Sequence, residues 1–190
     1  MGYKVKIGLS NKHLHLSAKD VETLYGAGHQ LTPMKDLGQP GQYACEEKVD
    51  IVGPKGTLKG VRVLGPVRPE TQVEISMTDG RSIGISAPVR ESGALDGTPG
   101  CKLVGPCGEV ELEKGVIVAL RHIHLHTDEA AEAGVADKEW VSIKIEGERG
   151  LVFENVLVRV SDKFAAECHL DTDEGNAAGC TNDSVCEILK

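Results

Sequence analysis

Short stretches in which apolar and polar residues alternate recur along almost the whole chain. Each is only a few residues long and stops at Gly, Pro or Asp, which is typical of strands joined by tight turns. The clearest of these stretches are residues 3–10, 47–54, 58–66, 71–77, 82–89, 101–106, 109–120, 140–147 and 151–161. Closure of such strands into barrels would remove exposed sheet edges. The pattern therefore predicts a mainly β protein built from two small antiparallel β-barrels.

Helical patterns are few and short. Ser17 and Asp20 form a capping motif before a segment that ends at Gly26, and Thr127 precedes a second segment that ends at Gly134. We expect a short helix after each of these caps, placed where it can plug the end of a barrel.

The chain repeats itself. K-H-L-H-L-S at residues 12–17 returns as R-H-I-H-L-H at residues 121–126, and each precedes one of the expected helices. I-V-G-P-K-G before one strand likewise resembles L-V-G-P-C-G before another. Repetition of this kind predicts two related β units. We place one barrel at residues 12–119 and the second at residues 1–11 and 120–190, so that the N-terminal strand joins the C-terminal half.

Composition and charge narrow the function. The chain has 190 residues, of which 40% are hydrophobic and 26% charged, and its formal net charge is −8. A surface of this charge has no general basic field for nucleic acid or an anionic membrane. No secretory signal or long apolar run is present, and the six cysteines lack C-x-x-C spacing, so we expect reduced thiols in a cytoplasmic protein.

The repeated histidine pairs are the strongest chemical signal. Seven histidines scattered over 190 positions would give roughly 0.3 pairs at i and i+2, whereas three are present. On a strand, His13 and His15 point to one face while Leu14 and Leu16 point to the core, and His122 and His124 repeat this arrangement. Two imidazoles so placed can bind one divalent metal together with a ligand from another strand. The alternative is that they are exposed histidines at two strand ends.

Two further residues are candidates for the third ligands. His169 follows a strand and precedes an acidic turn, and Glu74 is the strand carboxylate best placed by sequence to complete the first metal shell. We expect His29 to be solvated in a loop, and we do not expect His126, at the junction of strand and helix, to be a ligand.

Several long motifs carry a family resemblance. S-N-K-H-L-H-L-S, V-R-V-L-G-P-V-R-P-E-T-Q-V-E-I-S, S-A-P-V-R-E-S-G, G-V-I-V-A-L-R-H-I-H-L-H and H-L-D-T-D-E-G-N-A-A-G occur in order along almost the whole chain. Together with L-T-P-M-K-D-L-G-Q-P-G-Q-Y-A-C-E-E they resemble the PduL-type phosphate propanoyltransferases, a family of phosphate acyltransferases (phosphotransacylases). The chain departs from the family pattern at His126 and Thr127, where Thr or Ser is expected, and in the cysteine-containing tail after Gly179.

The resemblance implies an enzyme that interconverts acyl-CoA plus phosphate with acyl phosphate plus coenzyme A. It also implies two β-barrels with a dinuclear metal site between them, with two divalent ions per chain that are usually Zn²⁺. Arg68 matches the family's phosphate-binding, catalytic arginine. The metal ligands that the resemblance implies are His13, His15 and Glu74 for one ion and His122, His124 and His169 for the other. Positions that line the coenzyme A site in the family correspond to Lys35, Arg62, Leu64 and Asn176.

Other classes of protein remain open at this point. A metal-dependent hydrolase, or a non-catalytic metal-binding or shell-associated protein, would also use such histidine pairs. Strand-like sequence begins by Tyr3, so we expect no N-terminal extension for encapsulation in a bacterial microcompartment and favour a freely cytoplasmic enzyme.

Overall fold

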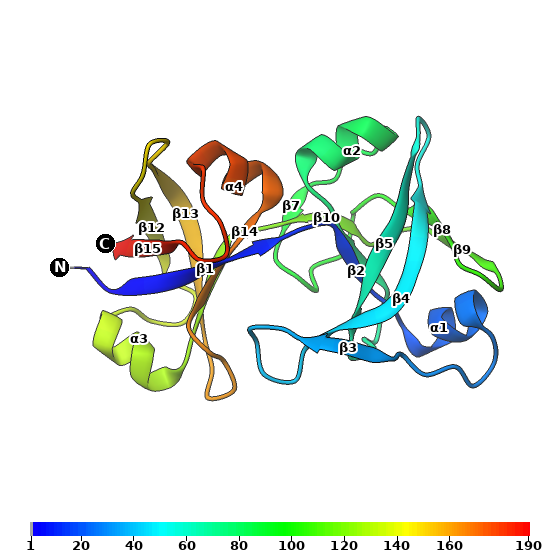
Figure 1. The fold of residues 1–190 in the computed structure, drawn as a ribbon, viewed down its shortest axis with the longest axis horizontal. Helices are drawn as coiled ribbons and strands as arrows, with labels where there is room; N and C mark the ends of the chain where they lie inside the picture. Colours follow the sequence, from blue (N-terminus) through cyan, green and yellow to red (C-terminus); the bar gives the residue numbers. More distant parts are fainter. Residues whose placement is uncertain (1) are drawn as a thin grey trace. The chain divides into compact units, whose positions relative to one another are not determined.

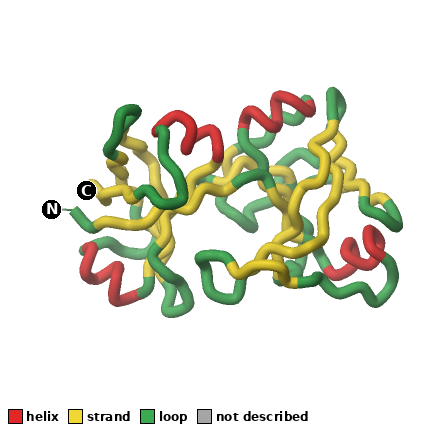
Figure 2. Tube along the Cα trace, viewed as in Figure 1, coloured by secondary structure: helices red, strands yellow, loops and turns green. Residues whose placement is uncertain are grey.

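The computed structural model describes residues 2–190 as fifteen strands and four short helices (Figure 1). Strands dominate the trace, and each helix is brief (Figure 2). The chain divides into two compact units. We call Met1–Ser10, Gly38–Pro40 and Leu120–Lys190 the barrel unit, and Asn11–Leu37 with Gly41–Ala119 the sheet unit.

The barrel unit is a closed barrel of six strands. β1, blue in Figure 1, is hydrogen-bonded to β14 on one side and to β15 on the other. Buried aliphatic side chains such as Ile7, Ile123 and Ile143 fill its interior. In barrel order the strands are β1 (Lys4–Ser10), β14 (Glu167–Asp171), β11 (His122–Leu125), β13 (Leu151–Val160), β12 (Trp140–Ile145) and β15 (Val185–Leu189). Two helices belong to this unit, α3 (Thr127–Ala133) and α4 (Thr172–Ala178).

The sheet unit is a nine-stranded sheet with its own core, which includes Leu14, Leu16 and Ile51. In sheet order its strands are β7 (Val89–Arg90), β10 (Val116–Ala119), β6 (Gln72–Glu74), β2 (His13–His15), β5 (Thr57–Gly65), β4 (Tyr43–Val52), β8 (Cys101–Val104) and β9 (Glu109–Leu112). A ninth strand, β3 (Pro33–Asp36), pairs with β4. Its helices are α1 (Ala18–Tyr25) and α2 (Met77–Ile83).

The prediction of a mainly β protein with two barrel-like units and short helices is confirmed, with two differences of detail. Only the first unit closes into a barrel. The sheet unit ends at β7, which has two residues, and at β9, which carries Glu109 and Glu111; short and charged strands protect an open edge. The strand pairing is also mixed, because β2 is parallel to β5, and β11 to β13. Such pairs need a crossover between the strands, and here that crossover includes a helix.

Local capping decides where the helices begin. α1 has the expected cap, because the Ser17 side chain accepts a hydrogen bond from the Asp20 amide. α3 lies where expected, but its N-cap is His126, and Thr127 is the first helical residue. The His126 side chain accepts a hydrogen bond from the Asp128 amide and so caps the helix in place of the expected hydroxyl group of Thr127.

Two helices were not predicted. Residues 77–83 form α2, so the strand expected at residues 82–89 was wrong, and only Val89–Arg90 is a strand there. Residues 172–178 form α4 in place of the expected acidic turn. Both are seven residues long and contain Gly with Asp or Asn, which are poor helix formers, so their N-terminal caps outweigh propensity. Across residues 2–190 none of the helices has the length and apolar character needed to cross a membrane.

The barrel core sets the stability of its unit. Ile143 is fully buried on β12, whereas Val152, on the neighbouring strand β13, is 49% exposed. We predict that Ile143→Ala lowers the free energy of unfolding by about 2–5 kcal/mol, because it leaves a cavity in a packed core. Val152→Ala is the matched control and should cost under about 1 kcal/mol. Urea denaturation of both variants measures this, and equal losses would contradict it.

Candidate metal centres

The first histidine pair lies on β2, in the sheet unit. β2 runs antiparallel to β6 in a register that places His13 opposite Glu74 and His15 opposite Gln72. Directly opposed residues on an antiparallel pair share a face, with Cβ atoms about 4.5–5.5 Å apart. Ligand atoms of His13, His15 and Glu74 consequently lie within 4.8 Å of one another.

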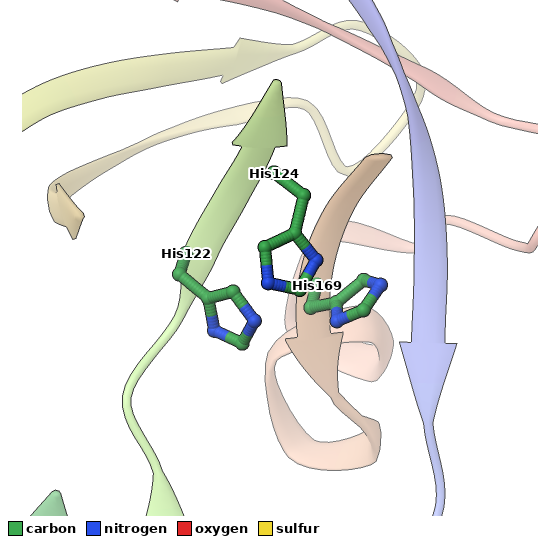
Figure 3. Close-up of side chains that lie close together, drawn as sticks. All are labelled: His122, His124 and His169. Atoms are coloured by element: carbon green, nitrogen blue, oxygen red, sulfur yellow. The ribbon is translucent and has the colours of Figure 1, made fainter. Parts of the chain in front are cut away.

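The second pair repeats this geometry in the barrel unit. β11 runs antiparallel to β14, with His122 opposite His169 and His124 opposite Glu167. Ligand atoms of the three histidines lie within 4.8 Å of one another, and their rings converge in Figure 3. In both units, then, the third candidate ligand is the cross-strand partner of the first histidine.

The elements around each pair are also repeated. The N-cap of a helix lies two residues after the second histidine; this helix is α1 in the sheet unit and α3 in the barrel unit. Another N-cap lies two residues after the third ligand, and it belongs to α2 in the sheet unit and to α4 in the barrel unit. The basic residue directly before each histidine pair forms an ion pair with an acidic residue of α2 or α4, three residues after the N-cap of that helix. These ion pairs are Lys12 with Asp79, at 2.9 Å, and Arg121 with Glu174, at 2.7 Å.

Backbone carbonyls fix the tautomer of the first histidine in each pair. Nδ1 of His13 lies 2.8 Å from the carbonyl oxygen of Asn11, and Nδ1 of His122 lies 2.8 Å from that of Leu120. A carbonyl oxygen only accepts, so Nδ1 of each ring carries a proton and Nε2 is the nitrogen left for other partners. Nε2 is therefore the atom that each ring offers to a metal.

The second histidine in each pair has a buried nitrogen that the protein does not satisfy. Within residues 2–190, Nδ1 of His15 and Nδ1 of His124 have no hydrogen-bond partner, although the residues are only 2% and 4% exposed. Leaving a buried polar atom unpaired costs free energy, and coordination to a cation would remove that cost.

The protonation of these side chains favours metal binding as well. Burial, with the nearby charges of Arg68 and His13, lowers the pKa of His15 to about 3. Burial, with His122 and His169, lowers the pKa of His124 to about 2. Both rings are neutral at pH 7, which is the form that binds a metal. The two triads fit divalent cations in charge, donor type and spacing.

Glu74 is an anion in the first triad. Burial opposes ionisation, but His13 outweighs it and holds the pKa of Glu74 well below its usual range. The same interaction changes the pKa of His13. Burial lowers that pKa, but the Glu74 carboxylate has the larger total effect, so the pKa is raised. One carboxylate and two imidazoles make three protein ligands, a set that suits Zn²⁺ at a centre where a fourth position stays open.

Arg68 is held beside the first triad. Its backbone amide donates to the Leu16 carbonyl at 2.9 Å, and its Nη1 donates to Oγ of Ser92 at 2.9 Å. Gln72 donates to both Ser92 and Glu74, so a short chain of hydrogen bonds joins the arginine to the candidate ligand. We did not identify Ser92 or Gln72 from the sequence, because a Ser and a Gln without a repeated pattern give no signal.

The other predicted substrate residues fall in both units. Lys35 is exposed on β3, and Leu64 lies on β5; each is a register partner of Ala44, on the strand between them. Arg62 on β5 donates from Nη1 to the carbonyl of Cys45 at 2.7 Å. Asn176 is exposed on α4 of the barrel unit.

The remaining histidines have structural partners. His29 was expected to be solvated, and this was wrong: its Nε2 lies 2.8 Å from the buried Glu47 carboxylate, and its ring stacks on Tyr25. His126 is a helix cap and belongs to neither triad. The six cysteines are all free thiols.

Comparisons with known proteins agree with one family. The family model described as phosphate propanoyltransferase matches residues 6–181. The phosphate propanoyltransferase of Thermotoga maritima is 58% identical over 90% of this chain and 82% of its own length. Those of Salmonella typhimurium (55% identical, over 94% of this chain and 85% of the relative) and Clostridioides difficile (51%, over 98% and 89%) are similar across the same region.

Proposed function

From the premise that this chain belongs to the phosphate propanoyltransferase family, and is thus an acyltransferase that acts on acyl-CoA and phosphate, we propose a mechanism of direct transfer assisted by two metal ions. The reaction interconverts a short-chain acyl-CoA plus phosphate with acyl phosphate plus coenzyme A. The observation that carries the proposal is the pair of repeated triads, each with a buried histidine nitrogen that lacks a partner.

The residues that would hold the two ions are His13, His15 and Glu74 for one, and His122, His124 and His169 for the other. Zn²⁺ suits both sets, since it prefers nitrogen and oxygen ligands and keeps an open position at catalytic centres. When bound, the ions supply Lewis acidity toward the thioester carbonyl and the departing sulfur. We propose that both triads act on the same transfer.

Arg68 is the residue we propose to hold phosphate. A guanidinium binds two phosphate oxygens at once through a planar fork, which a lysine cannot copy. The Ser92 hydroxyl fixes one arm of that fork, as the bond at 2.9 Å indicates. Lys35, Arg62, Leu64 and Asn176 would then contact coenzyme A.

The transfer needs no covalent acyl-enzyme. A phosphate oxygen forms a bond to the acyl carbon while the carbon–sulfur bond breaks, and the electron pair leaves on the sulfur of coenzyme A. The work of the protein is to orient the two reactants, which can account for a large share of a rate enhancement.

The first test asks for the reaction and the metals together. With propanoyl-CoA, the purified protein should release free thiol only when phosphate is present, and elemental analysis should find about two divalent ions per chain, as two three-ligand sets require. Thiol release without phosphate would indicate a hydrolase, and no release would indicate a binding protein. Absence of metal, with activity that survives prolonged chelation, would overturn the proposed centres.

Arg68→Lys tests the phosphate-binding role. We predict that this variant keeps its fold and metal content but loses apparent affinity for phosphate and turnover, because the charge remains while the two-point geometry is lost. Steady-state kinetics over a range of phosphate concentrations measures this. Arg81→Lys, at an exposed position on α2, is the matched control. Parental kinetics in Arg68→Lys would mean that Arg68 has another role.

The last test asks whether the two triads serve one reaction. His13→Ala and His124→Ala should each abolish acyl transfer, and each should empty a different metal position. Residues that act as one catalytic unit are not additive, so the double variant should be scarcely worse than either single one. Turnover, metal content and circular dichroism are measured for all three variants. Rate losses that multiply would instead indicate independent sites.

A further inference from the structure

We propose that Glu167 is a positioning residue for the centre of His122, His124 and His169, where it orients the His169 ring and selects the nitrogen that faces the metal. The inference rests on the proposed metal centre but concerns a residue that neither the sequence patterns nor the repeated ligands single out. Glu167 lies outside the triad, since its carboxylate is not among the ligand atoms that meet within 4.8 Å.

The contact that carries the proposal is between the two side chains on β14. Oε2 of Glu167 lies 2.7 Å from Nε2 of His169. An ionised carboxylate only accepts, so Nε2 carries the proton and the lone pair of His169 is on Nδ1. Figure 3 shows one ring nitrogen of His169 on the side of His122 and His124 and the other on the opposite side of the ring. The hydrogen bond therefore presents Nδ1 to the centre, in contrast to Nε2 of His122.

The backbone is shaped to receive this carboxylate. A Cβ atom added to Gly38 would overlap both carboxylate oxygens of Glu167, and one added to Gly8 would lie 2.9 Å from its carboxyl carbon. Neither glycine has a positive φ that would itself require glycine. Next to Gly38, Gln39 is 4% exposed and is tied to the backbone of Ala165, with its Nε2 3.0 Å from the carbonyl oxygen. The two glycines thus leave a space that the Glu167 carboxylate fills.

The repeat gives an independent argument. Glu167 is the cross-strand partner of His124, and Gln72 is the cross-strand partner of His15. Gln72 donates to the third ligand of its triad, the carboxylate of Glu74, and Glu167 accepts from the third ligand of the other, His169. An amide faces a carboxylate ligand, and a carboxylate faces an imidazole ligand. In both units, therefore, the cross-strand partner of the second histidine is a residue that can form a hydrogen bond to the third ligand: a donor where that ligand is a carboxylate, and an acceptor where it is an imidazole.

The test measures Co²⁺ binding in full-length protein that carries His13→Ala and His15→Ala, so that only the centre in the barrel unit remains. Co²⁺ reports its affinity and ligand geometry through its visible absorption. In this parent, Glu167→Ala should weaken Co²⁺ binding by about 10–100-fold, the usual effect of losing a carboxylate that orients a ligating histidine. Glu167→Gln should lose less, because its amide oxygen can still accept from His169. Glu146→Gln, at an exposed carboxylate of the same unit, should change nothing.

Gly38→Ala supplies a second, independent variant. Its Cβ would displace the carboxylate, so alone it should weaken Co²⁺ binding as Glu167→Ala does. The three atoms nearest to that Cβ all belong to the Glu167 side chain, so in the Glu167→Ala background Gly38→Ala should cause no further loss. Additive losses would mean that Gly38 acts through the fold, and would overturn the inference.

The outcomes separate this inference from the proposed function. A parent that binds no Co²⁺ overturns the metal centre and the inference with it. A parent that binds Co²⁺, with affinity within about twofold in Glu167→Ala, overturns the inference alone, given the loss expected for an orienting carboxylate. A visible spectrum in Glu167→Ala that reports one protein ligand fewer would make Glu167 a ligand and would also overturn it. Weaker binding with an unchanged ligand set supports it.

Discussion

The register between two antiparallel strands is the constraint on which both candidate centres depend. β2 against β6 and β11 against β14 each place the first histidine opposite the third ligand. Because side chains alternate between faces, a slip of one residue would move His13 and His15 into the core and expose Leu14. The buried leucines and isoleucines that flank the histidines therefore fix the positions of the candidate ligands, because the side chains on the apolar face determine where those on the polar face point.

Unsatisfied polar groups explain the rest of each centre. A strand that brings two imidazoles out of water must find partners for four ring nitrogens, and the chain supplies them unevenly. The first ring is held by a carbonyl two residues upstream, at 2.8 Å in both units, whereas Nδ1 of the second ring has no partner among the described residues. The first ring of each pair is thus oriented, and the second ring is neutral with one nitrogen that lacks a partner. This is the state in which binding a cation gains most, since little of the site has to rearrange.

The sequence could predict what depends on periodic or repeated features. The strands, the histidine pairs and the cap at Ser17 follow from alternation and spacing, and Glu74 and His169 could be nominated because strands must supply a third ligand. Helices α2 and α4 could not be predicted, since their residues have poor propensity and their caps are recognisable only once the strand before them is placed. The network of Ser92 and Gln72, and the space for Glu167 beside Gly38, join segments that are distant in sequence. Contacts of that kind leave no periodic trace.

The two centres differ in where they keep one negative charge. Each centre has two histidines, a third ligand and the cross-strand partner of the second histidine, and in each exactly one of the last two is a carboxylate. In the first centre the candidate ligand Glu74 accepts a hydrogen bond from the neutral Gln72. In the second centre the candidate ligand His169 is hydrogen-bonded to the carboxylate of Glu167. Moving the carboxylate one hydrogen bond outward conserves the local charge, and it would leave a bound metal with three neutral ligands. Less charge is then donated to that ion directly, so it should be the stronger Lewis acid of the two. With ions bound as proposed, the repeat would give two centres of unequal character from one strand geometry, which would suit a reaction whose two reactants, a thioester and a phosphate, differ in charge.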